Sequence, residues 1–261
     1  MLPVMDGPVF PPPPRSARPV RREWDALSSL PPSTRRFDPA QVADLPPAAR
    51  RWLTHAVEPG VPLARAVALT MHGHIKLGSW RPFRATQILA PGVGFVWAAT
   101  ARVAGLPVLG YDGYADGRGE MNWKLGGLIP VMSAATADVG TSAAGRLASE
   151  FVFVPSTFGT ATWHEAGPDA ALATWRIGPH TETVCLELAG NGRLGAVHLD
   201  RWGNPNGKPF GRYPFGVDIE AETSFGGITI PSRFRAGWWW GTNRWSEGEF
   251  FRAEVTAAAF R

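Results

Sequence analysis

The chain has 261 residues, 44% of them hydrophobic, a length and composition that suit one large domain with a substantial core. Thirty glycines and 25 prolines favour many turns between short strands over long helices. The net charge is +4, but residues 1–36 hold six arginines against three acidic residues. The rest is nearly neutral and lacks the cationic face that nucleic-acid binding requires, which excludes that partner.

Residues 1–36 are predicted to be a disordered tail, because they are rich in proline and arginine and poor in apolar residues. The first ten residues lack the pattern of a secretory signal. The most apolar stretch, residues 125–135, is much shorter than the roughly 18 residues of a membrane span. We therefore expect no integral membrane segment and a cytoplasmic location. The single cysteine, Cys185, excludes an internal disulfide.

A short amphipathic helix is predicted at residues 48–57, after Pro46 and Pro47, with Trp52 and Leu53 facing the core. From residue 66 the apolar period changes to two, which indicates half-buried strands. A second helix is predicted at residues 138–151. Strands are predicted at residues 66–77, 82–89, 94–103, 107–114, 119–125, 160–165, 171–177, 181–188, 193–201, 211–225, 228–240 and 249–257.

About a dozen short strands and two helices predict a mainly β (α+β) fold for residues 37–261, taken as a single domain. So large an antiparallel sheet is expected to curl into a half-barrel or barrel, with the central helix packed inside it. Twelve tryptophans, most in strand patterns, indicate either a wide aromatic core or an aromatic-lined cavity. The triplet at residues 238–240 cannot place all three indoles on one face of an extended strand.

Several polar groups are candidates for chemistry. His72 and His74 share one strand face, but a metal site needs a third ligand and none lies at a diagnostic spacing, so no metal site is predicted. Glu120 shares a strand face with Asn122 and Lys124, and serves as an acid or base only if that face lines a cavity.

Two His–Glu pairs and one arginine complete the set of candidates. The pairs His164–Glu165 and His180 with Glu182 lie beside turns, where surface positions are the default. Arg201 precedes a turn and is suited to stack on an indole or to clamp an anion. Local signatures of phosphate, dinucleotide, serine-hydrolase and zinc sites are absent from the sequence, and no cofactor is predicted.

Several segments resemble a bacterial family of uncharacterised proteins that is common in actinomycetes. The resemblance lies in residues 50–56, 71–75, 201–205, 225–232 and 236–238, and it covers about residues 37–261. More loosely, the layout resembles the curved-sheet carriers of lipoproteins and lipids in bacterial envelopes. That resemblance implies an apolar ligand site at the level of the fold.

The leading hypothesis is a pocket for a hydrophobic or amphiphilic small molecule. The predicted polar groups are Arg81, Glu120 and Arg201, and the predicted wall is formed by Trp97, Trp123, Trp175, Trp202 and Trp240. Two alternatives stay open. One is an enzyme (a cyclase, isomerase or hydrolase) that uses the same pocket with Glu120, His72 or His74 as acid–base groups. The other is a protein-interaction module that docks through its tryptophan segment and tail. The sequence does not define an oligomeric state.

Overall fold

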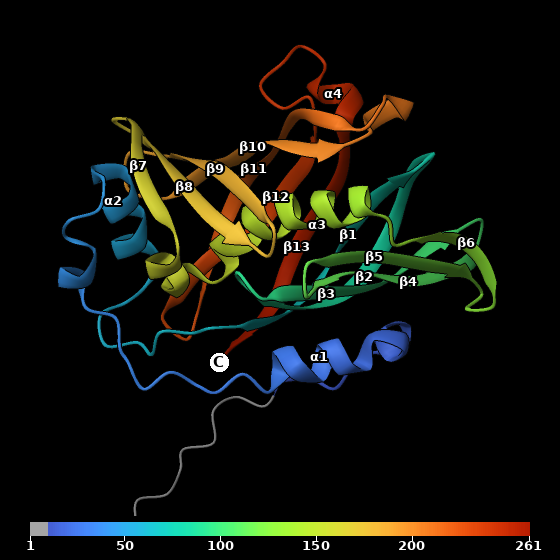
Figure 1. Ribbon diagram of the computed structural model, residues 1–261, viewed down its shortest axis with the longest axis horizontal. Helices are drawn as coiled ribbons and strands as arrows, with labels where there is room; N and C mark the ends of the chain where they lie inside the picture. The colour runs from blue at the N-terminus through green and yellow to red at the C-terminus, as the bar shows by residue number, and fades with distance from the viewer. Residues whose placement is uncertain (1–9) are drawn as a thin grey trace, which may run out of the picture.

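The computed structural model describes residues 10–261 (Figure 1). Thirteen strands form one antiparallel sheet: β1 (Val67–Leu77), β2 (Ser79–Ala90), β3 (Gly94–Val103), β4 (Leu106–Ala115), β5 (Arg118–Leu125), β6 (Ile129–Ala134), β7 (Thr162–Gly167), β8 (Ala170–Ile177), β9 (His180–Leu188), β10 (Leu194–Gly203), β11 (Gly211–Phe225), β12 (Ile228–Trp238) and β13 (Glu249–Phe260).

The helices are few and short. The α-helices are α1 (Arg21–Ser28), α2 (Pro47–Ala56), α3 (Ala137–Ser149) and α4 (Trp245–Gly248). The 3-10 helices are η1 (Arg15–Val20), η2 (Pro39–Val42), η3 (Glu150–Phe153), η4 (Pro155–Thr160) and η5 (Pro205–Gly207). Within residues 10–261, the structure has no helix long and apolar enough to cross a membrane.

The strand order in the sheet is β6-β5-β4-β3-β2-β1-β13-β12-β11-β10-β9-β8-β7. Two up-and-down runs, β1–β6 and β7–β13, are therefore joined where the last strand pairs with the first. The sheet curls but does not close, because β6 and β7 each end it. This half-barrel confirms the predicted mainly β fold, and Figure 1 shows α3 lying within its curve. Strand β6 was not predicted.

Small residues allow α3 to approach the concave face of the sheet closely. Gly119 of β5 faces the backbone of the helix: a methyl group at this position would lie 2.6 Å from the carbonyl oxygen of Val139. Ala144 and Leu147 of α3 are buried in the main core together with Trp52 and Leu53 of α2. The close fit fixes the height of α3 above the strands and leaves a hollow beside it.

The tail differs from the prediction, because residues 15–28 form helices on the convex face of the sheet (Figure 1). Trp24 is 1% exposed and donates its indole N–H to the carbonyl of Pro11 at 3.1 Å. It packs in a second core with Ala68 and Ile88. The outward positions of these strands are apolar, so the sheet needs a cover, and the tail provides it. Residues 1–9 lie outside the described part of the chain.

Candidate ligand-binding site

A cavity of about 280 Å³ lies between α3 and the concave face of the sheet. Most of its wall is apolar and much of that is aromatic, with contributions from β1, β3 and β11–β13. Among the apolar residues of the wall are Met71, Trp97, Phe215, Trp238, Phe250 and Phe251. An apolar cavity with a few polar groups at defined positions is the ordinary form of a small-molecule site.

Arg146 of α3 carries the first of these polar groups and is held by two carboxylates. Its Nη1 lies 3.1 Å from Asp112 Oδ2, and its Nε lies 2.8 Å from Glu150 Oε1. Gln87 donates to the other oxygen of Glu150, and Trp123 donates to the other oxygen of Asp112 at 2.9 Å. The guanidinium of Arg146 and both of its partner carboxylates are thus engaged by protein groups, as buried charges require.

Burial and the attraction between opposite charges act against each other on the pKa values of this group. It raises the pKa of Asp112 above its ordinary value, while Arg146 and the Trp123 hydrogen bond oppose the rise. Burial alone would lower the pKa of Arg146, but Glu150 and Asp112 outweigh that effect and raise it. Arg146 therefore stays a cation whose charge is compensated within the protein.

Arg201 of β10 lines the same cavity, but neither of the two carboxylates is in contact with it. Its Nε and Nη2 donate to the carbonyl and hydroxyl oxygens of Ser142, at 3.1 and 3.3 Å. Its guanidinium lies over Phe215 and Trp238, 4.7 and 5.4 Å from the ring centroids. Within residues 10–261 it forms no salt bridge, and its Nη1 has no protein partner.

The charge of Arg201 persists despite this environment. Burial and the neighbouring Arg146 lower the pKa of Arg201 to about 10, while the carboxylates of Glu150, Asp112 and Glu182 oppose the shift. At this pKa the guanidinium stays protonated at neutral pH. The cavity therefore contains two guanidinium groups: Arg146 with two carboxylates and Arg201 with none. A cation enclosed in this way is a site where an anion from outside the chain is stabilised.

The predicted tryptophans are distributed over different parts of the interior. Trp97 lines the cavity, and Trp123 packs beside it with the ring centroids 5.7 Å apart. Trp175 belongs instead to an aromatic cluster with Phe151, at a centroid distance of 3.9 Å. Trp202 donates to Asp138 at 2.9 Å and so ties β10 to the start of α3.

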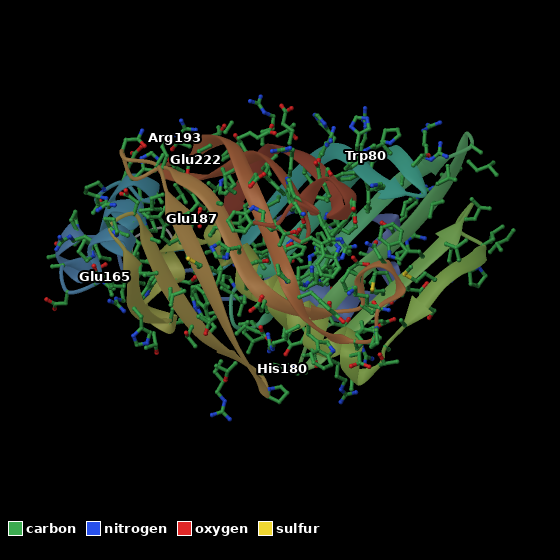
Figure 2. All side chains as sticks on the ribbon, turned by 90° about the horizontal axis from the view of Figure 1, so that it is seen from above. Trp80, Glu165, His180, Glu187, Arg193 and Glu222 are labelled. Carbon is green, nitrogen blue, oxygen red and sulfur yellow. The ribbon has the colours of Figure 1, made fainter. Side chains whose placement is uncertain are left out.

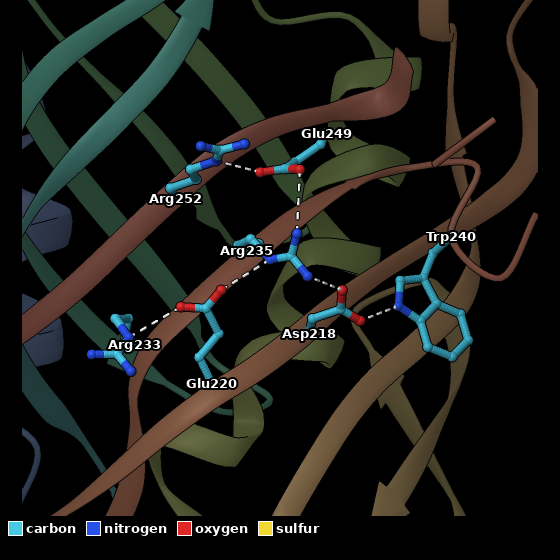
Figure 3. A network of polar contacts seen from close by, with 7 residues as sticks. All are labelled: Asp218, Glu220, Arg233, Arg235, Trp240, Glu249 and Arg252. Carbon is cyan, nitrogen blue, oxygen red and sulfur yellow. Dashed lines mark hydrogen bonds and ion pairs between the residues drawn. The ribbon is translucent and has the colours of Figure 1, made fainter. Parts of the chain in front are cut away.

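Trp240 lies on the convex face, away from the cavity. It stacks on His198 with the ring centroids 4.3 Å apart, and its indole N–H donates to Asp218 at 2.7 Å (Figure 3). The cause is local: Trp239 has a φ of +63°, which breaks the strand alternation. The triplet thus separates, with Trp238 in the cavity wall and Trp240 outside.

The structure does not bring the predicted acid–base residues into the cavity. Glu120 accepts a hydrogen bond from the hydroxyl of Tyr111, which belongs to the convex core under α1. His72 and His74 pair in register with Glu254 and Arg252, in a shallow hollow of the same outer face.

The remaining candidates are also dispersed. Arg81 of β2 is half-buried, but it is not part of the cavity wall. The two His–Glu pairs do not converge, and Figure 2 shows Glu165 and His180 well apart.

Sequence reasoning missed Gln87, Arg146 and Glu150, and it gave Asp112 no role. A signal for two of them was present: Arg146 and Glu150 are four residues apart, which places them on one side of a helix otherwise rich in alanine and glycine. Asp112 lies alone in an apolar strand pattern, and a lone acid there needs a buried partner. Nothing local pairs a residue of β4 with one of α3.

Residues 43–260 match a family of unknown function, DUF6920. The chain belongs to this family. This membership confirms the resemblance to an uncharacterised family that the sequence motifs indicated. No curated protein matches the sequence.

Several solved structures are similar to the chain. A putative outer membrane lipoprotein-sorting protein domain from Vibrio parahaemolyticus is 11% identical, with a TM-score of 0.40 over 75% of this chain and 85% of that one. A DUF1329 family protein from Desulfovibrio piger is 10% identical, with a TM-score of 0.41 over 76% and 86%. A LolA superfamily protein from Nitrosomonas europaea is 12% identical, with a TM-score of 0.38 over 82% and 92%. Likeness this distant does not bear on function, which is inferred below from the residues of this chain.

Proposed function

We propose that this protein binds an amphiphilic small molecule, with the anionic head of the ligand at Arg201 and its apolar part in the cavity beside α3. The observation that carries the proposal is the contrast between the two arginines. Arg146 is neutralised by Asp112 and Glu150, whereas Arg201 is a cation without a carboxylate partner among residues 10–261. A carboxylate or similar group on a ligand would complete its coordination.

The placement of Arg201 suits this role. Its hydrogen bonds to Ser142 and its stacking on Phe215 and Trp238 fix the guanidinium plane before a ligand arrives. A group held in this way loses little side-chain entropy on binding, which favours affinity. The cavity volume is close to the lower end of the range for ligand pockets, about 300–1,000 Å³, and suits a single medium-length chain.

Binding is favoured over catalysis by the position of the groups suited to proton transfer. Glu120, His72 and His74 lie on the convex face, and the carboxylates that do reach the cavity are engaged by Arg146. Residues 15–28 of the tail pack against the chain's own sheet, so this part of the tail already has a structural role. That packing speaks against docking of a partner protein through this part of the tail.

The test compares dodecanoate with dodecanol, which have the same carbon chain and differ in the head group. Binding is followed by intrinsic tryptophan fluorescence, since Trp97 and Trp238 line the cavity, and by calorimetry. We expect dodecanoate to bind about tenfold or more tightly, because hydrogen bonds to a charged group contribute about 1.5–3 kcal/mol. Equal affinity of the two ligands, or no binding of either, would refute the proposal.

Variants separate the head-group site from the cavity. Arg201→Met keeps an unbranched apolar stem but removes the guanidinium, and it should remove the preference for dodecanoate while dodecanol still binds. Arg233→Met is the matched control, because Arg233 lies on the convex face, where it pairs with Glu220 at 3.0 Å (Figure 3). Ala236→Phe fills the cavity and should abolish binding of both ligands.

A further inference from the structure

One end of the half-barrel carries an unusual concentration of exposed apolar side chains. In the run β1–β6, the turns that join β1 to β2, β3 to β4 and β5 to β6 all lie at the same end of the strands, because antiparallel neighbours alternate in direction. Eight large hydrophobic side chains are exposed in the described residues, and six of them lie at these turns or in β6. This hairpin-tip surface consists of Leu77, Leu106, Leu128, Ile129, Val131 and Met132.

The exposure is greatest at the β5–β6 turn, where Leu128 is 84% and Ile129 is 62% exposed. The turns are adjacent in space as well as in order: the backbone N–H of Gly126 donates to the carbonyl of Pro107 at 2.7 Å. The turn beside Leu106 therefore lies against the turn that carries Leu128. Exposed apolar side chains gathered in this way mark an interaction site.

The charged residues within the hairpin-tip segments are all basic. Residues 75–81, 101–108 and 124–134 contain no acidic residue, and they include the cations Lys76, Arg102 and Lys124. None of these three forms a salt bridge within residues 10–261. The nearby Glu247 of α4 accepts from Lys76 only through its backbone carbonyl, and its carboxylate pairs with Arg244 at 3.0 Å.

We propose that the hairpin-tip surface docks on an anionic lipid membrane. Its apolar side chains enter the interface between head groups and acyl chains, and Lys76, Arg102 and Lys124 contact the lipid phosphates. Apolar side chains flanked by cations are the combination that holds peripheral proteins on negatively charged bilayers. Leu128, at the tip, enters deepest.

A second copy of the chain is a poorer occupant of this surface. Strand β6 is an edge of the sheet, but Pro130 has no backbone N–H to donate to an added strand. A symmetric pair would also bring the same cations of two copies together, and like charges in close contact are unfavourable. A bilayer with anionic lipids offers the opposite charge.

The position of the surface gives docking a consequence for the cavity. Ile75 and Met121 belong to β1 and β5, two of the strands that end in the hairpin tips, and both line the cavity wall. When the protein is docked on a membrane, this side of the cavity therefore faces the lipid. An amphiphilic ligand could then pass between the cavity and the bilayer. Docking itself does not require the proposed ligand, so the two proposals are tested separately.

The experiment is flotation of the full-length, ligand-free protein with vesicles of phosphatidylcholine alone or mixed with phosphatidylglycerol. We expect binding only to the mixed vesicles, weakening as salt is added. Leu128→Asp should lower the binding constant by about tenfold or more, as loss of a buried leucine implies. Lys124→Glu together with Arg102→Glu should lower it by at least a similar factor.

The matched control is Val93→Asp, because Val93 is 52% exposed in the β2–β3 turn at the opposite end of the same strands. It should bind vesicles like the unchanged protein. Equal losses for Leu128→Asp and Val93→Asp, or no binding of the unchanged protein to anionic vesicles, would overturn the proposal. So would a dimer in light scattering that Leu128→Asp dissociates, without vesicle binding, since this face would then join two copies.

A second readout reports the depth of the tip directly. A Leu128→Cys variant, made in a Cys185→Ser background so that it holds one thiol, carries an environment-sensitive fluorophore. Its emission should shift to the blue when anionic vesicles are added. A label at Val93→Cys in the same background should not shift, and an equal shift at both positions would contradict insertion through this end.

Discussion

Arg146→Met tests how the charges of the cavity wall are balanced. The substitution leaves Asp112 and Glu150 in the wall without their cation, and the side chains of these charges are only 17–18% exposed. Removing one partner of a buried ion pair destabilises a protein by about 3–5 kcal/mol. Against a total stability of about 5–15 kcal/mol, that loss is large. Urea unfolding followed by circular dichroism measures it.

The loss is expected to depend on pH. Burial already raises the pKa of Asp112, and without Arg146 the pKa rises further. The folded variant then binds a proton more tightly than its unfolded chain, so its stability falls as pH rises through the raised pKa and recovers below it. The deficit relative to the unchanged protein should therefore shrink in mildly acid solution.

A matched variant removes the charges together. Arg146→Met combined with Asp112→Asn and Glu150→Gln leaves no unpaired ion, and it should recover much of the lost stability. A deficit below about 1 kcal/mol for Arg146→Met alone, or a deficit that is the same at acid and neutral pH, would refute the reasoning.

Three further substitutions test the packing. Gly119→Ala should destabilise the protein by about 1–3 kcal/mol in urea unfolding, because the new methyl group meets the backbone of α3 at Val139; an unchanged midpoint would contradict the close fit. Trp24→Ala should cost about 3–5 kcal/mol and expose residues 10–30 to proteolysis, whereas a tail that contributes nothing would show neither effect. Gly145→Ala places a methyl group 3.1 Å from Cγ of Arg201, so dodecanoate affinity should fall several-fold without loss of stability. Unchanged affinity would show that Arg201 moves aside freely.

The charged residues on the convex face show what a local sequence pattern can and cannot predict. It predicts which face of the sheet a side chain occupies, but not which residue of a neighbouring strand it pairs with. The alternation of Val217 and Ile219 with Asp218 and Glu220 places the acids outside, as the structure has them. Figure 3 shows Arg235 of β12 bridging both acids, at 3.0 Å each. Each pair joins two strands, so it depends on the register between β11 and β12, which no local period encodes.

The same limit explains the errors in the site. The structure places Arg201 in the cavity wall, but that it contacts no carboxylate is visible only once α3 lies over β10. Trp240 lies outside the predicted wall, because the positive φ of Trp239 interrupts the alternation of the predicted strand at residues 228–240. The composition of the tail predicts disorder, but apolar residues of the tail pack against the apolar convex face of the sheet.

The sequence by itself determined twelve of the thirteen strands, two of the helices and the mainly β, curled character of the sheet, because side-chain periodicity and turn residues act over a few positions. Only the tertiary structure decided which hollow stays open, which arginine remains without a carboxylate, and which face the tail covers. Those features depend on contacts between residues far apart in the chain, where packing and charge pairing are set by the whole fold.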